Sequence, residues 1–137
     1  MRAFLDTNVL VYLFDSSSPR KQRRARDVFA ERTERDEAVL SPQVLQEFYV
    51  TVTRKLAAPM PEDKAERLVR SFAALPVVTT DAALVLAAVV LSRRNQLSLW
   101  DALIVAAAKA GGASELLSED LQHGQVIEGI RVVNPFA

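Results

Sequence analysis

Short apolar runs alternate along the chain with longer segments whose apolar residues recur at helical spacing. The short runs are too brief to form helices, and continuous apolar character is typical of strands buried on both faces. This alternation predicts an α/β fold in which a parallel β-sheet is flanked by α-helices on both faces. Because no repeat or linker interrupts the pattern, residues 1–137 are expected to form a single domain. The strands are expected at 3–5, 38–40, 116–117 and 130–133, with the last at a sheet edge and with 77–79 either a strand or an extended link.

Capping residues mark where several of the helices begin. Ser41 precedes Pro42, a pair that is typical of an N-cap followed by the first helical residue. Thr80 or Asp81 is expected to cap one later helix, and Ser98 is expected to cap the last. The predicted helices cover residues 9–14, 20–35, 42 to the proline break at 59, 62–75, 82–94 and 98–109.

Four isolated acidic residues interrupt or border the apolar segments. Asp6 and Asp120 follow predicted strands, Glu47 lies on the helix after Pro42, and Asp101 lies in the first turn of the last helix. Carboxylates rarely occupy such surroundings unless they are paired or bind a cation. Ligands of parallel α/β sheets bind outside the carboxyl ends of the strands. The four side chains are therefore candidates for a single site.

Each of the four residues also has an ordinary structural interpretation. Asp6 could be a helix N-cap, although its polar neighbours in the sequence could cap that helix instead. Asp101 follows Ser98 at the spacing of a capping box. Glu47 could be an exposed residue at the rim of an amphipathic helix, and Asp120 could be an ordinary loop aspartate. The spacing alone leaves both interpretations open.

The composition narrows the chemistry that these carboxylates can support. The chain has no cysteine and a single histidine, His123. Disulfides, thiolate chemistry and a zinc site with several histidines are therefore excluded. Carboxylate oxygens favour Mg²⁺ or Mn²⁺, and such an ion allows an acidic pocket to bind a phosphodiester and activate water. The residues thus predict a metal-dependent phosphodiesterase whose substrate is nucleic acid.

Net charge and surface features add little to this prediction. Seventeen basic and seventeen acidic residues leave no net charge, so no overall field attracts a polyanion. The basic run at 20–26 is expected to be a solvated helix face, although it could follow an RNA backbone. Trp100 is expected to pack against its helix, although it could stack on a base. No signal peptide or apolar run long enough to span a bilayer is evident, so we expect a cytoplasmic protein without membrane association.

The four acidic residues lie in the segments FLDTNVL (4–10), VLQEFY (44–49), LWDALI (99–104) and LSEDL (117–121). In this order, and over essentially the whole chain, these segments make the protein resemble the PIN (PilT N-terminus) domain family, in particular its VapC-type toxin ribonucleases. The resemblance implies that Asp6, Glu47, Asp101 and Asp120 converge around Mg²⁺ or Mn²⁺ at the strand ends. Three polar residues also match positions near the family's site, where they would hydrogen-bond the carboxylates or a phosphate: Thr7, Asn8 and Ser118.

The resemblance also implies a role for each carboxylate. Asp6 and Asp101 would be the primary metal ligands. Glu47 would support the site or orient the attacking water, and Asp120 would hold a second ion or position the first. Family members of this type cut RNA, form homodimers, and are inhibited by a small antitoxin whose tail blocks the acidic pocket.

The leading hypothesis is therefore a Mg²⁺- or Mn²⁺-dependent endoribonuclease that acts as the toxin of a type II toxin–antitoxin pair. A structure-specific DNA nuclease is an alternative, since it would use the same chemistry. A non-catalytic module, whose acidic residues cap helices and bind arginines of a partner, is a second alternative.

Overall fold

Strands and helices alternate along the chain, as the apolar pattern predicts. A computed structural model describes residues 1–137. The elements are, in order, β1 (Arg2–Leu5), α1 (Thr7–Tyr12), α2 (Pro19–Glu34), β2 (Ala38–Val39), α3 (Pro42–Arg54), α4 (Glu62–Ala73), α5 (Ala82–Asn95), α6 (Leu99–Ala110), β3 (Ala113–Leu117), β4 (Val126–Ile127) and β5 (Ile130–Val133).

The five strands form one mainly parallel sheet with the order β2-β1-β3-β5-β4. Four of them are parallel, and β4 pairs antiparallel with β5 at the edge. The expectation that β5 lies at an edge is wrong, because the two-residue strand β4 covers it. A strand that short leaves no readable period in the sequence. The segment 77–79 is an extended link that makes a single parallel bridge, between Leu40 and Val77.

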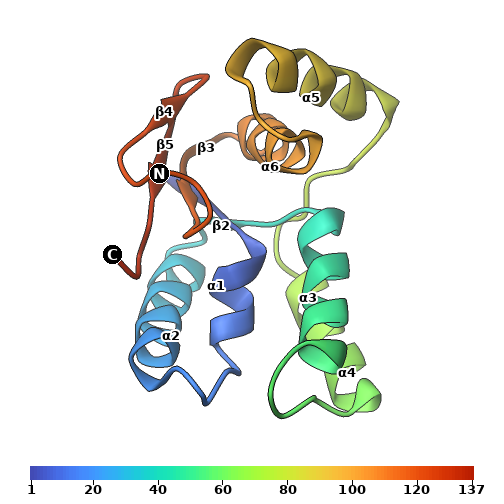
Figure 1. The fold of residues 1–137 in the computed structure, drawn as a ribbon, viewed down its shortest axis with the longest axis vertical. Helices are drawn as coiled ribbons and strands as arrows, with labels where there is room; N and C mark the ends of the chain where they lie inside the picture. The colour runs from blue at the N-terminus through green and yellow to red at the C-terminus, as the bar shows by residue number, and fades with distance from the viewer.

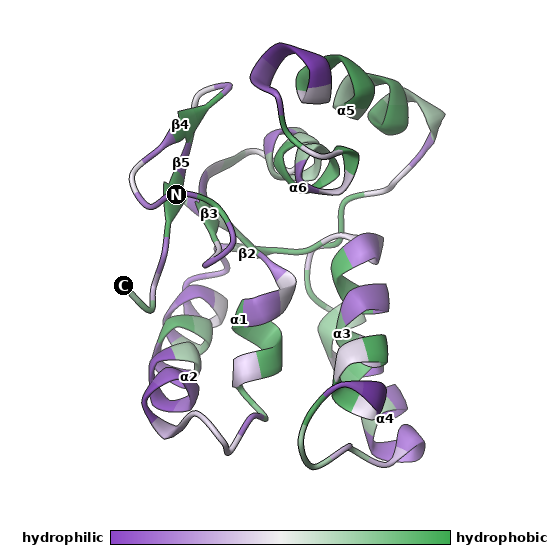
Figure 2. Ribbon diagram, viewed as in Figure 1, coloured by the Kyte–Doolittle hydropathy of each residue, from purple (hydrophilic) through white to green (hydrophobic).

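Helices cover both faces of the sheet, which confirms the predicted α/β fold class. In Figure 1, α6 and the outer helix α5 lie on one side of the strands, and α1 to α4 lie on the other. Figure 2 shows that the central strands are hydrophobic, whereas α2 carries long hydrophilic stretches. The core between the layers includes the fully buried Phe4, Leu10, Val105 and Leu116. None of the helices combines the length and the apolar composition that crossing a lipid bilayer requires.

Two of the predicted caps are confirmed, and one behaves differently. Asp81 caps α5 by accepting a hydrogen bond from the Leu84 amide at 2.9 Å, and Ser98 caps α6. Ser41 holds the N-cap position of α3, but its side chain makes no capping hydrogen bond, and its buried hydroxyl has no partner. At the start of α3 the Ser41 carbonyl accepts a hydrogen bond from the Leu45 amide, and the fixed φ of Pro42 suits the first helical turn.

The basic run at the start of α2 has a structural role that the sequence did not indicate. Arg20 and Arg24 donate hydrogen bonds to the carbonyl oxygens of Phe136 and Pro135, at 3.1 Å and 2.9 Å. These bonds fasten the last residues of the chain to α2. Part of the run therefore holds the C-terminal segment and is not simply a solvated face.

Candidate active site

The register of the sheet brings together residues that lie far apart in the sequence. Leu5 of β1 is paired with Leu117 of β3, and both strands end there. The backbone amide of Asp6 donates a hydrogen bond to the Leu117 carbonyl at 3.0 Å. Asp6 and Ser118 are therefore adjacent at the carboxyl end of the sheet, where parallel α/β proteins bind their ligands.

Asp6 is the most buried of the four acidic residues, with 6% of its surface exposed. Its Oδ1 accepts a hydrogen bond from the Thr7 amide, and its Oδ2 accepts one from the Ser118 hydroxyl, each at 2.7 Å. Asp6 therefore caps α1 itself, and the suggestion that a neighbouring residue could take this position is wrong. Burial raises the pKa of Asp6 to about 6, and the negative charges of Asp120 and Glu47 add to the effect.

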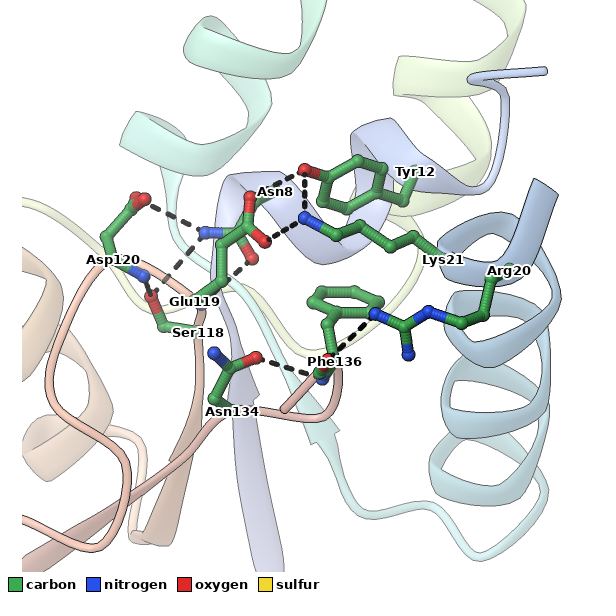
Figure 3. Close-up of polar contacts among 9 residues, drawn as sticks. All are labelled: Asn8, Tyr12, Arg20, Lys21, Ser118, Glu119, Asp120, Asn134 and Phe136. Carbon is green, nitrogen blue, oxygen red and sulfur yellow. Dashed lines mark hydrogen bonds and ion pairs between the residues drawn. The ribbon is translucent and has the colours of Figure 1, made fainter. Parts of the chain in front are cut away.

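Polar side chains on α1 orient two further carboxylates. The Thr7 hydroxyl donates a hydrogen bond to Glu47 Oε1 at 2.7 Å, across to α3. The Asn8 amide donates to Asp120 Oδ2 at 3.2 Å, and Figure 3 shows Asn8 and Asp120 facing each other beside Ser118. The side chains of Thr7, Asn8 and Ser118 thus each donate a hydrogen bond to one of the carboxylates that the sequence singles out.

Asp101 is placed by the start of α6. Its backbone amide donates to the Ser98 hydroxyl at 3.1 Å, which is half of a capping box. The reciprocal bond is not formed, and the Asp101 carboxylate has no hydrogen-bond partner within the chain. Capping therefore accounts for Ser98 and leaves the Asp101 carboxylate free for another ligand.

All four carboxylates line one open cleft with a volume of about 610 Å³. Asp15 and Glu119 also line it, whereas Lys55 is its only basic residue. Burial raises the pKa of Asp120, and the nearby negative charges of Glu119, Asp101 and Glu47 raise it further. The cleft is therefore a strongly acidic surface in a protein that has no net charge.

The oxygen donors of the cleft suit a hard divalent cation. No three of the acidic side chains are gathered closely enough, as they lie, to ligate one ion together. Mg²⁺ is commonly held by one or two carboxylates and keeps several water ligands, so a tighter cluster is not required. With no cysteine in the chain and His123 outside the cleft, the donor set fits Mg²⁺ or Mn²⁺ better than zinc.

Trp100 does not lie where the sequence predicted, whereas His123 does. Trp100 was expected to pack against α6, but 65% of its surface is exposed and it lines the cleft. The expectation is wrong because Trp100 lies on the outward face of the first turn of α6. His123 is a loop residue outside the cleft, as expected, and its Nδ1 accepts a hydrogen bond from the Asn134 amide at 2.9 Å.

A cluster next to the cleft was missed from the sequence. The Lys21 ammonium donates to Glu119 Oε2 at 3.0 Å and to the Tyr12 hydroxyl at 3.2 Å, while Tyr12 donates to Glu119 Oε1 at 2.6 Å. The Tyr12 ring packs edge-to-face on Phe136, with centroids 4.9 Å apart. Figure 3 shows that α1, α2, the loop after β3 and the C-terminal segment meet here. The only sequence signal was the position of Glu119 next to Asp120.

We expect replacement of Lys21 with Met to lower the free energy of unfolding by about 1–2 kcal/mol, because it leaves a partly buried Glu119 carboxylate without its cation. Arg23→Met is the matched control, since Arg23 is exposed on the same helix, and it should change stability by less than about 0.5 kcal/mol. Urea unfolding measures both. Equal effects of the two substitutions on stability would show that the contacts of Lys21 with Glu119 and Tyr12 do not stabilise the loop after β3.

The fold and the cleft define a parallel α/β protein with an acidic site at the carboxyl ends of its strands. The PIN domain family model matches residues 3–128. The chain belongs to the PIN domain family. No curated relative matches the sequence.

Solved structures show the same fold at low sequence identity. A toxin–antitoxin complex from Klebsiella pneumoniae is 21% identical, with a TM-score of 0.71 and 97% of each chain covered. VapC20, a sarcin-ricin loop cleaving toxin of Mycobacterium tuberculosis, is 20% identical, with a TM-score of 0.66 and coverage of 86% of this chain and 91% of that one. DNA-bound VapBC from Salmonella typhimurium is 19% identical, with a TM-score of 0.65 and 96% of each chain covered.

Proposed function

We propose that this protein is a Mg²⁺- or Mn²⁺-dependent endoribonuclease and that it is the toxin of a type II toxin–antitoxin pair. Membership of the PIN domain family supports a nuclease. The observation that carries the proposal is the cleft in which Asp6, Glu47, Asp101 and Asp120 come together from four separate segments of the chain. An acidic cleft of this kind repels a phosphodiester unless a cation lies between them.

The contacts within the chain support a division of roles among the four carboxylates. Asp101, whose carboxylate is free, and Asp6, which is the most buried, would be the primary ligands of the ion. Glu47, held by Thr7, would orient the attacking water. Asp120, held by Asn8, would position the ion or support a second one.

The bound ion would supply Lewis-acid activation of water and stabilisation of the charge that develops on the phosphate. The chain itself contributes the geometry. Ser118 donates to Asp6 from a fully buried position, so the carboxylate that faces the cleft keeps one fixed orientation. Such preorganisation is what allows a polar site to act without rearranging during the reaction.

The similar structures favour RNA and a protein inhibitor. One is a sarcin-ricin loop cleaving toxin, and others are toxin–antitoxin complexes. By extension, this chain would be inhibited by a small antitoxin that covers the acidic cleft, and it would act as a homodimer. Basic residues of an antitoxin would complement the six carboxylates that line the cleft.

We expect the purified protein to cleave single-stranded RNA in the presence of Mg²⁺ or Mn²⁺, to leave a matched DNA oligonucleotide intact, and to be inactive in EDTA. Asp101→Asn should slow cleavage by about a hundredfold or more, since it removes a ligand carboxylate with little change in shape. Gel electrophoresis of end-labelled oligonucleotides measures the rates.

The matched control is Asp63→Asn, which makes the same chemical change at an exposed site on α4, away from the cleft. It should cleave at the unmodified rate. Cleavage of the DNA but not of the RNA would favour the DNA nuclease. If neither nucleic acid is cleaved in the presence of metal ions, the non-catalytic module is the remaining hypothesis.

A further inference from the structure

We propose that the cleft contains a binding site for one unpaired nucleobase, formed by an uncharged strip next to the carboxylates. The strip consists of Gln43, Gln46 and Val50 on α3 and Trp100 on α6. All four residues line the cleft. The inference rests on the proposed nuclease function and adds to it the class of group that the enzyme holds beside the scissile phosphate.

Helix geometry makes the strip continuous. Gln43, Gln46 and Val50 recur every three or four residues, so they lie along one face of α3. The Gln43 side-chain amide donates to the Trp100 carbonyl at 3.3 Å, which joins α3 to the start of α6. The two walls of the strip are therefore in direct contact.

The chemistry of the strip matches a base rather than a phosphate. Trp100 is 65% exposed and Val50 is 47% exposed, so two apolar surfaces face the solvent within the cleft that holds the carboxylates. Aromatic rings bind unpaired bases by stacking, and glutamine amides can donate to and accept from base edges. None of the four residues is charged, so a base that covers the strip does not have to displace the water around a charged side chain.

The strip lies next to the carboxylates, where a base close to the scissile phosphate would be held. Trp100 precedes Asp101 and Gln46 precedes Glu47, so each wall carries a strip residue next to a carboxylate. Lys55, just beyond the end of α3, is the only basic residue that lines the cleft. A nucleotide with its base on the strip could thus extend its backbone either toward the carboxylates or toward the Lys55 ammonium group. Duplex nucleic acid, whose bases are stacked and paired, would not offer this base.

Trp100 is the only tryptophan of the chain, so its fluorescence reports the strip directly. In an Asp6→Asn background, in which cleavage is expected to be greatly slowed, a short single-stranded RNA should quench this fluorescence, whereas the same backbone without bases should not. Trp100→Ala should weaken binding of a labelled RNA by about 5- to 150-fold, the range found for loss of one stacked base. Trp100→Phe should restore most of the affinity. Fluorescence anisotropy measures these affinities.

Leu86→Ala is the matched control, because Leu86 is 66% exposed but lies on α5, away from the cleft. It should bind RNA with unchanged affinity. Equal RNA binding by Trp100→Ala and Leu86→Ala would overturn the base site even if the enzyme proves to be a ribonuclease. Loss of binding to a protein inhibitor alone, with RNA affinity unchanged, would overturn it as well and would assign Trp100 to a protein interface. Trp100-dependent RNA binding without any cleavage would instead contradict the nuclease function and leave the base site standing.

Discussion

Replacement of Asp6 with Asn is expected to make the metal-free protein more stable at neutral pH while it reduces RNA cleavage by about a thousandfold or more. The two effects have one cause. The Asp6 carboxylate is ionised at neutral pH in a site where only 6% of its surface is exposed, and burial raises its pKa from 3.8 to about 6. Asparagine removes that buried charge and also removes a carboxylate that we propose as a metal ligand.

The sign of the pH dependence follows from the direction of the shift. Because the pKa of Asp6 is higher in the folded than in the unfolded protein, the folded state binds the proton more tightly. Above about pH 6 the carboxylate is ionised in both states, and the native protein is destabilised by at most about 3 kcal/mol. This penalty disappears as the pH falls from about 6 to about 4. The stability advantage of Asp6→Asn should therefore be largest at pH 7–8 and vanish near pH 4.

Urea unfolding of both proteins across this pH range, in EDTA, measures the difference. Asp63→Asn again controls for the chemistry of the substitution, since Asp63 is exposed and should show no such trend. If Asp6→Asn were less stable than the original protein at pH 7, its hydrogen bonds to Thr7 and Ser118 would outweigh the burial of its charge.

Metal ions should reverse the order of stability. A ligand that binds only the folded protein stabilises it by about 2.7 kcal/mol at a hundred times its dissociation constant. Mn²⁺ should thus raise the melting temperature of the original protein and of Asp63→Asn but have little effect on Asp6→Asn. An equal response of all three proteins would show that Asp6 does not belong to the proposed metal site.

Replacement of Phe48 with Ala is expected to have the largest effect on the fold, a loss of about 3–5 kcal/mol in the free energy of unfolding. Phe48 is fully buried, and its ring packs edge-to-face on Phe72 and Phe14, with centroids 5.1 Å and 5.9 Å apart. Truncation leaves a cavity between α3 and α4. Phe48 follows Glu47 on α3. The contacts of the Phe48 ring therefore also help to hold α3 in the position at which the Glu47 carboxylate lines the cleft.

Phe48→Leu keeps an apolar side chain in this space and should cost about 1 kcal/mol. Urea unfolding compares the two variants, and cleavage measured well below the unfolding transition tests the placement of Glu47. A cost below about 1 kcal/mol for Phe48→Ala would show that the core around α3 closes over the cavity.

The amino-acid sequence by itself was enough to predict the class of fold and to identify the four carboxylates as candidates for a functional site. Local alternation of apolar strands and amphipathic helices is encoded in short stretches of sequence, so the α/β class and most helix positions could be predicted. The four acidic residues were evident because each interrupts or borders an apolar segment of the sequence. Their roles as ligands remain a proposal.

The tertiary structure decided what depends on contacts between distant segments. Pairing of Leu5 with Leu117 sets Ser118 against Asp6, and the short β4 turns β5 from an edge into an inner strand. The spacing of Ser98 and Asp101 matched a capping box but left the role of Asp101 open, and the structure shows that its carboxylate is free. Burial of a side chain and the partners of a charge depend on which helices and strands pack together. A local pattern does not contain that information, which is why Trp100 was expected to pack against its helix but lies exposed in the cleft.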